Sequence, residues 1–262
     1  MNARPVTFNK MRAMGKNPNW ATPTRRLTLP GLVIAAILAL ALATTLSGCV
    51  NVATYTQPTL VRVIDASYIA PAVNVYVEGT LLAGNIGQGT ITPYGTLTPN
   101  TAAPIKITAA TATTALTTTS GTLLAGHQHS VLITDNGAAP NLYTVTILED
   151  QQTSAAGGHS AFRFLNQAPK TGAIDIYMVP AGVTLANSIP IVRNLPVGAT
   201  AGYISFTSQT VTMVVTPTGL TTPKYTSTPL ALIGGEVRTV LLVDTQLTSD
   251  PPVQAFIATD VN

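Results

Sequence analysis

The chain has 262 residues, of which 46% are hydrophobic, 9% are charged and 5% are aromatic, and its formal net charge is +3. Six of its basic residues and none of its acidic residues precede position 49, so residues 49–262 carry seven basic and ten acidic side chains. The net charge of that part is −3, which excludes a broad basic surface for nucleic acid. We therefore expect no nucleic-acid partner.

Residues 1–48 have the three parts of an export signal: a basic front, an apolar segment and a short end of small residues. The apolar segment, residues 31–46, is shorter than the roughly 20 apolar residues that a membrane-spanning helix needs. The signal ends in Leu46-Ser47-Gly48, followed by Cys49, the only cysteine of the chain. This pattern resembles the lipobox of bacterial lipoprotein signal peptides.

The lipobox resemblance implies that the chain is cut before Cys49, which then carries acyl chains such as palmitate. Residues 49–57 would form a tether from the membrane to the folded part. We expect an exported protein that is anchored by lipid, on the periplasmic or surface face of an outer membrane where one exists, because Val50 rather than an aspartate follows the cysteine. Arg25-Arg26 also resembles a weak twin-arginine signal, so the export route stays open.

The remainder of the chain repeats itself. Residues 61–77 match residues 162–178 at an offset of 101, and two later segments match at an offset of 109. The second copy has eight extra residues within 181–193. The repeat predicts two domains, 58–150 and 160–262, joined by a linker at 151–159.

Each copy has the pattern of short strands. Val73, Val75 and Val77 alternate with polar residues, as in a half-buried strand, and glycine and proline turn signals recur every few residues. We predict an all-β protein of two tandem antiparallel β-sandwiches of the Ig-like or Greek-key type, with about seven or eight strands each. The Thr- and Ala-rich segment 108–122 fits a strand or a low-complexity stalk.

The first copy carries an Arg-x-x-Asp-Ala-Ser pattern from Arg62, followed by Pro-Ala-Val-Asn-Val-Tyr-Val-Glu-Gly over residues 71–79. These motifs resemble the bacterial family called domain of unknown function 4397, and the resemblance covers nearly all of residues 58–262. It implies one or more such units on an exported protein and supplies no catalytic residue. The second copy departs from the pattern at Gln167-Ala168, Gly172 and Pro180.

His127 and His129 are the most site-like pair in the chain. Residues two apart on a strand face the same side, roughly 7 Å from each other, so both imidazoles could reach one zinc or copper ion. The second copy has Glu236 and Arg238 at the equivalent places. Two solvated histidines at the end of a strand are the alternative, and we favour it.

A polar set occurs at the same positions in both copies. It would be either a recognition patch or a cross-strand cluster in which arginine lies over tyrosine. We expect each arginine beside its Asn/Asp or Tyr on an exposed sheet face, so that Arg62→Ala would barely change stability. The set consists of Arg62, Asn74, Tyr76, Arg163, Asp175 and Tyr177.

Motifs of known catalytic sites and cofactor-binding loops are absent from the sequence, and Glu149-Asp150 fits a solvated strand end. The sequence therefore predicts a non-enzymatic protein without cofactor, with a structural or binding role in the cell envelope. Its partners would be the membrane, through Cys49, and an envelope protein or glycan. The alternative is a carbohydrate- or metal-binding accessory module of an envelope enzyme or uptake system.

Overall fold

The computed structural model of the protein describes residues 56–68, 71–135, 142–246 and 249–261. The predicted signal peptide, its lipobox residues 46–48 and Cys49 lie outside the described residues. The described residues belong to one compact unit, Tyr55–Asn262. No helix within them is long and apolar enough to span a membrane.

The first copy folds into a sandwich of two four-stranded sheets, ordered β4-β1-β7-β8 and β3-β2-β5-β6. Its core is built from alternating valine and isoleucine side chains of both sheets, among them Val61, Val75 and Ile107. The strands are β1 (Thr59–Asp65), β2 (Val73–Val77), β3 (Thr80–Ile86), β4 (Gly95–Leu97), β5 (Asn100–Ala109), β6 (Ala115–Leu123), β7 (Gln128–Asp135) and β8 (Tyr143–Asp150).

The second copy repeats this arrangement with the sheets β12-β9-β16-β17 and β11-β10-β13-β14, where β15 also pairs with β13. Its core contains Phe162, Phe164 and Met213. The elements are β9 (His159–Gln167), β10 (Ile174–Pro180), the 3₁₀ helix η1 (Leu185–Asn187), β11 (Val192–Leu195), β12 (Thr200–Thr207), β13 (Gln209–Pro217), β14 (Tyr225–Thr226), β15 (Leu230–Leu232), β16 (Val237–Asp244) and β17 (Val253–Val261).

The predicted all-β class is confirmed, with eight strands in the first sandwich and nine in the second among the described residues. Segment 108–122 forms the end of β5 and most of β6, and the eight extra residues of the second copy surround η1. One feature differs from a purely antiparallel sandwich: β1 pairs with β7, and β9 with β16, in parallel. The opposite sheet lies within each connection, which gives the long crossover that parallel strands require.

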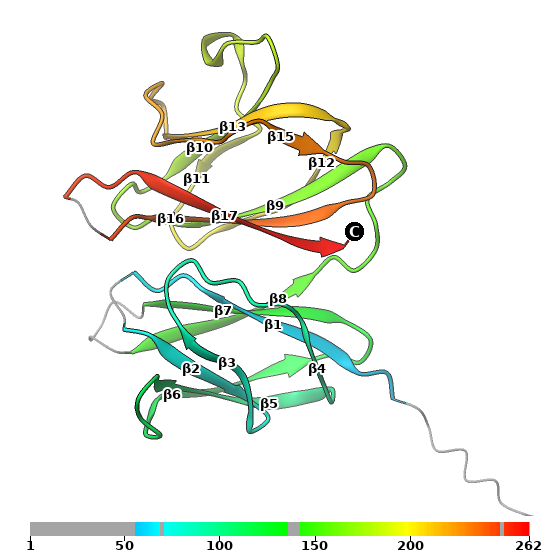
Figure 1. Ribbon diagram of the computed structural model, residues 1–262, viewed down its shortest axis with the longest axis vertical. Coiled ribbons are helices and arrows are strands. Elements are labelled where there is room, and N and C mark those ends of the chain that lie inside the picture. Colours follow the sequence, from blue (N-terminus) through cyan, green and yellow to red (C-terminus); the bar gives the residue numbers. More distant parts are fainter. Residues whose placement is uncertain (1–55, 69–70, 136–141, 247–248, 262) are drawn as a thin grey trace, which may run out of the picture. The chain divides into compact units, whose positions relative to one another are not determined.

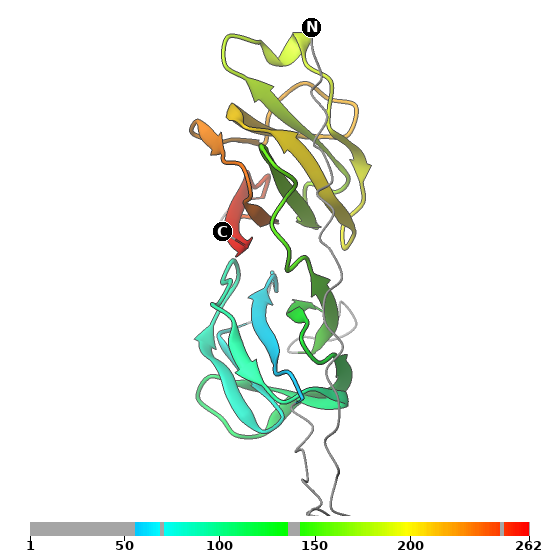
Figure 2. The same ribbon diagram turned by 90° about the vertical axis from the view of Figure 1, so that its right-hand side faces the viewer.

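The two sandwiches contact each other through the sheets β4-β1-β7-β8 and β12-β9-β16-β17, which we call the interface sheets (Figures 1 and 2). A separate apolar cluster joins them, including Ile64, Leu132, Leu165 and Leu241. The two sandwiches are therefore in direct contact across these sheets. The boundaries 58–150, 151–159 and 160–262 stay a prediction.

Candidate functional site

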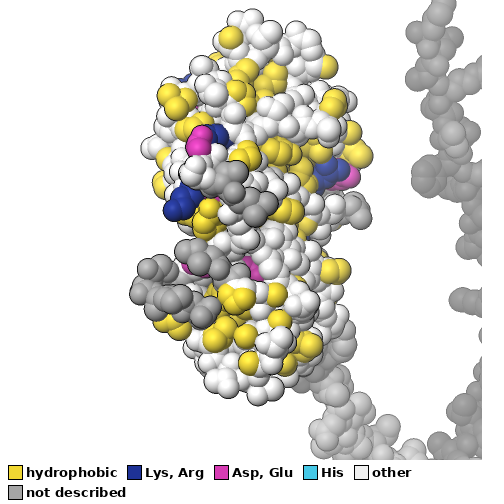
Figure 3. All heavy atoms as spheres, turned by 60° about the vertical axis from the view of Figure 1, so that its left-hand side comes forward, with side chains coloured by type: hydrophobic (Ala, Val, Ile, Leu, Met, Phe, Trp, Pro, Cys, Tyr) yellow, Lys and Arg dark blue, Asp and Glu magenta, His cyan; other side chains and the backbone are white. Residues whose placement is uncertain are grey.

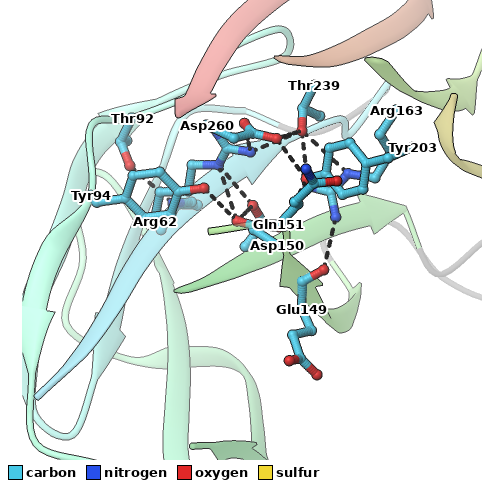
Figure 4. Close-up of polar contacts among 12 residues, drawn as sticks. Arg62, Thr92, Tyr94, Glu149, Asp150, Gln151, Arg163, Tyr203, Thr239 and Asp260 are labelled. Atoms are coloured by element: carbon cyan, nitrogen blue, oxygen red, sulfur yellow. Dashed lines mark hydrogen bonds and ion pairs between the residues drawn. The ribbon is translucent and has the colours of Figure 1, made fainter. Parts of the chain in front are cut away.

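Arg62 and Arg163 lie at equivalent positions of β1 and β9, and both are buried, with 1% and 3% of their surface exposed. Val61 and Val63 point into the core of the first sandwich, so Arg62 points to the opposite face of the sheet. That face is covered by the interface sheet of the other sandwich. Figure 4 shows both arginines converging there on one polar cluster.

The ion pairs of these arginines are reciprocal. Arg62 Nη2 lies 2.6 Å from Asp260 Oδ1 at the end of β17, in the second sandwich. Arg163 Nη2 lies 2.5 Å from Asp150 Oδ1 at the end of β8, in the first sandwich. Each arginine thus lies closest to the aspartate of the other copy, and both pairs connect the two sandwiches. Arg62 Nε also lies 3.6 Å from Asp150 Oδ2 of its own sandwich.

A hydroxyl group supports each aspartate from its own sandwich. Ser130 Oγ accepts a hydrogen bond from Arg62 Nε at 2.7 Å and donates to Asp150 Oδ2 at 2.6 Å. Thr239 Oγ1 accepts from Arg163 Nε at 3.2 Å and donates to Asp260 Oδ2 at 2.7 Å. Thr239 also accepts from Arg62 Nη2 at 3.0 Å, which adds another contact between the copies.

Two tyrosines complete the cluster. The hydroxyls of Tyr94 and Tyr203 each donate to the aspartate of their own sandwich at 2.6 Å. The Arg62 guanidinium carbon lies 4.7 Å from the centroid of the Tyr94 ring, and that of Arg163 lies 4.9 Å from the Tyr203 ring. We call the whole set the reciprocal network: Arg62, Tyr94, Ser130, Asp150, Arg163, Tyr203, Thr239 and Asp260.

The network contains two guanidinium groups and two carboxyl groups, so its formal charges cancel. Burial alone would lower the pKa of Arg62, but the nearby carboxylates of Asp260 and Asp150 outweigh it and raise that pKa. Burial raises the pKa of Tyr94 and of Tyr203, which keeps both phenols protonated as hydrogen-bond donors. This arrangement holds two surfaces together through charge-assisted hydrogen bonds.

The expected position of Arg62 beside Asn74 or Tyr76 is wrong. β1 pairs with β4 and β7, whereas β2 pairs with β3 and β5 in the opposite sheet. The short connection between β1 and β2 crosses from one sheet to the other and does not form a hairpin. Arg163 is separated from Asp175 and Tyr177 in the same way, because β9 and β10 belong to different sheets.

Asn74 and Asp175 instead fix equivalent loops. Asn74 Oδ1 accepts from the backbone N–H of Asn85, and Asp175 Oδ1 accepts from that of Asn194, at 2.8 and 2.7 Å. Asn85 and Asn194 have positive φ angles of 53° and 49°. The role of these polar side chains is thus local support of a strained backbone.

Tyr76 and Tyr177 have different surroundings. The Lys106 ammonium lies 4.5 Å from the centroid of the partly exposed Tyr76 ring. Tyr177 is buried on the outer face of its sheet with Val179 and Val214, and Leu185 of η1 packs against them. The six residues of the predicted patch therefore form no common surface in either copy.

His127 and His129 do face the same side, and their stacked rings have centroids 6.2 Å apart. His127 Nδ1 lies 2.6 Å from Glu149 Oε1, and His129 Nε2 accepts a hydrogen bond from the Leu124 backbone. His129 is 3% exposed and burial lowers its pKa, so it is not a solvated histidine. Across the described ranges, no three His, Cys, Asp or Glu residues are grouped so that they could hold a metal ion.

Sequence reasoning missed most of the reciprocal network, and it took Asp150, which is 3% exposed, for a solvated strand end. A signal was present in the repeat. Tyr94 and Tyr203 stand at the same offset of 109 as Ser130 and Thr239, and an aspartate is the last residue of β8 and the last but one of β17. Only the contact between the sheets shows that these residues meet.

Residues 59–177 match the family described as Domain of unknown function (DUF4397). The match is a single one that covers the first copy and the beginning of the second. A second copy of the same family at residues 160–262 therefore stays a prediction. No protein with a curated description matches this chain.

Two solved structures are similar to the chain at 11% sequence identity. CBMbc (family CBM26) from Eubacterium rectale Amy13K, in complex with maltoheptaose, has a TM-score of 0.23, with 76% of this chain and 96% of that chain covered. A candidate cell adhesion protein from Bacteroides eggerthii has a TM-score of 0.20, with 78% and 95% covered. At these TM-scores neither similarity carries an argument about function.

Proposed function

We propose that this protein is an exported, lipid-anchored cell-envelope protein with a non-enzymatic structural or binding role, in which the two sandwiches act as one rigid unit. The observation that supports this role is the reciprocal network. Its buried charges are paired with each other between the two copies, so they fix one sandwich on the other.

Rigid docking follows from the cost of separating the two interface sheets. Pulling them apart would break the ion pair between Arg62 and Asp260, and sliding them while they stay in contact would leave both charges buried without partners, which typically costs about 3–5 kcal/mol. It would also expose the apolar cluster around Ile64 and Leu241. Such a unit presents its remaining surfaces in a fixed orientation to an envelope partner.

The anchor is tested with the Cys49→Ser variant. Serine lacks the thiol that accepts the acyl groups, and two or three acyl chains hold a protein on a membrane far better than one does. We expect wild-type protein to incorporate labelled palmitate and to sediment with membranes, and Cys49→Ser to do neither. Equal labelling of both proteins would disprove lipidation at this residue.

The binding role is tested by purification of the full chain from native membranes, followed by identification of the proteins and glycans that remain bound. An Arg62→Ala/Arg163→Ala variant with the same anchor is the control for rigid docking. We expect the captured component to be lost or reduced in this variant. A component bound equally by both proteins would show that the fixed arrangement is not needed.

A groove at the seam of the sandwiches favours glycan binding as a second candidate function. It has a volume of about 630 Å³, within the usual size range of small-molecule sites, and it is lined by neutral polar side chains. Amide groups can donate to and accept from sugar hydroxyls. Binding of the full chain to a glycan array tests this function. We expect Gln254→Ala to lose the binding and Gln209→Ala, which changes an exposed residue outside the groove, to keep it. The polar lining consists of Gln88, Thr90, Thr245, Gln246 and Gln254.

A further inference from the structure

The outer strand β6 of the first sandwich has an unusually open edge. It runs for nine residues, Ala115–Leu123, without a charged residue or a proline, and it pairs only with β5 among the described strands. Its register with β5 is regular from Thr117 to Gly121. Proteins usually protect such edges with charges, prolines, bulges or short strands, because unpaired N–H and C=O groups bind further strands.

The corresponding edge of the second sandwich is protected. There β13 pairs with two short strands, β14 and β15, which are separated by a segment that contains Pro229. Lys224, just before β14, bonds through its backbone oxygen to Val253 N at 3.1 Å and through its ammonium group to Asp250 at 2.5 Å. These contacts tie this edge to the neighbouring sheet. On β6, the described hydrogen bond to the neighbouring sheet is a single one, from Tyr143 N to Thr117 Oγ1, beside the packing of Gly121 against Ile147.

We propose that β6 is an interface at which a second copy of this chain adds its own β6, in antiparallel pairing about a two-fold axis near Thr119. In this pairing, exposed residues of one copy would lie opposite exposed residues of the other, and inward-facing residues opposite inward-facing ones. Thr118 would face Ser120 of the second copy on the exposed side, and Thr117 would face Gly121 on the inner side. Paired hydroxyl side chains on neighbouring strands stabilise a sheet, and uncharged edges do not repel each other.

The residues of β6 also fit the surroundings of an added strand. The opposite sheet ends at β8, so a single strand added beyond β6 would have no strand of this copy beneath it. A second copy placed by this two-fold axis brings its own β8, which lies beneath its own β6, so both sheets of the sandwich would continue. β6 has threonine on both faces: Thr118 is exposed, whereas Thr117 and Thr119 are half-buried. In this arrangement Thr117 and Thr119 of both copies would stay covered, which an added strand without a second sheet does not achieve.

Disulfide formation tests the pairing in the full-length chain, purified in detergent. Directly opposed residues of antiparallel strands have Cα atoms about 4.5–5.5 Å apart, which a disulfide can join. We expect Thr119→Cys to form a covalent dimer on mild oxidation. The parent chain, which also contains Cys49, and Thr226→Cys on the protected edge should remain monomeric on denaturing gels.

Light scattering supplies the second measurement. The parent chain should have twice the monomer mass, and Thr119→Lys, which adds a charge to the edge, should have the monomer mass with an unchanged circular dichroism spectrum. A monomeric parent chain at every concentration would overturn the proposal. Equal crosslinking of Thr119→Cys and Thr226→Cys, or protection of β6 by a co-purified peptide of another protein, would do so as well.

Discussion

A buried arginine is stable in a β-sandwich only where other groups replace the water around its charge. Arg62 has such groups on every side: Asp260 and Thr239 from the second sandwich, and Ser130 and the Tyr94 ring from its own. Half of these partners come from the other copy. The stability of each sandwich is therefore coupled to that of the other at the level of single side chains.

Arg62→Ala should be strongly destabilising. The change leaves Asp260 buried without its counter-ion, so we expect a loss of about 3–5 kcal/mol in the free energy of unfolding, measured by urea denaturation. The matched control is Lys224→Ala, whose partner Asp250 has 88% of its side chain exposed, and which should change stability by no more than about 1 kcal/mol. Similar effects of the two changes would contradict the role of the reciprocal network.

Asp65 binds a proton more tightly in the folded protein than in the unfolded chain, because burial raises the pKa of its carboxyl group. Its Oδ1 accepts hydrogen bonds from Ser67, but among the residues that the structure describes its buried Oδ2 has no hydrogen-bond partner. The equivalent Asn166 uses its amide group to donate to the backbone oxygens of Gly172 and Leu195, at 2.9 Å each. A protonated Oδ2 would copy this donor, and burial raises the pKa of Asp65 accordingly.

Asp65→Asn should therefore stabilise the protein at neutral pH. Because the folded pKa is raised above the unfolded value of about 3.9, the contribution of Asp65 to stability is fully present below that value and is lost as the pH rises through the folded pKa. The variant lacks this loss. We expect a gain of about 1–3 kcal/mol at pH 7 that disappears near pH 4, measured by thermal melting at both pH values.

Asp244→Asn is the control for the charge at Asp65 and should have the opposite effect. Both oxygens of Asp244 accept from Thr171, and one also accepts from the backbone N–H of Lys170. An amide group there would face donors with a donor of its own, so stability should fall at pH 7. If both variants were more stable than the wild-type protein, the loss of a negative charge, and not the new amide donor, would explain the effect of Asp65→Asn.

The turn between β3 and β4 contributes a close contact between the copies. Gly89 has a φ of +85°, and a Cβ on it would lie 2.3 Å from the ring of Phe256 on β17. The equivalent Gly198 has a φ of +80°, with nothing within 4 Å of its Cβ position. Both glycines are required by their backbone, but only Gly89 is also required by the neighbouring sandwich.

Gly89→Ala should consequently cost more stability than Gly198→Ala. Both changes carry the strain of a positive φ, about 1–2 kcal/mol, and Gly89→Ala adds overpacking at Phe256 of about 1–3 kcal/mol. Urea denaturation of the two variants isolates this second contribution. Equal losses would mean that Phe256 moves away without cost.

The strands were predictable because alternation and turn residues are local signals. Val73, Val75 and Val77 mark β2, and alternation of valine and threonine marks β13. The sheet to which a strand belongs is not a local property. A short loop leads from β1 to β2 in the opposite sheet, and this alone moved Arg62 away from Tyr76.

The same limit explains the candidate site. Alternation indicated that Arg62 lies on the face opposite Val61 and Val63, and this is the case. It could not show whether that face meets solvent or a second sandwich. The unbroken burial of β9 from Ser160 to Gln167 carries this information, because a strand of a free sandwich would have an exposed face. In the sequence, the sign of this burial is the Phe162–Leu165 segment, which is apolar on both faces of the strand except for Arg163.

For the whole molecule, the interface resembles a domain core more than a contact between independent domains. Its apolar cluster includes six buried residues, and its polar cluster pairs all four of its charges. Interfaces between independently moving domains are usually more polar and less tightly paired. We therefore expect the two sandwiches to unfold as one cooperative unit, although each has its own core.

The chain should then unfold in a single transition. If one half unfolded, the other would expose its part of the apolar cluster around Ile64 and Leu165, and its arginine would lose the opposing aspartate. Unfolding of one half therefore destabilises the other. Differential scanning calorimetry of residues 50–262 should give equal calorimetric and van't Hoff enthalpies, as two-state unfolding requires. In Arg62→Ala/Arg163→Ala, where both ion pairs are removed, the transition should broaden or split in two. Two separate transitions in the wild-type protein would instead show that the sandwiches are independent domains, and that the reciprocal network only orients them.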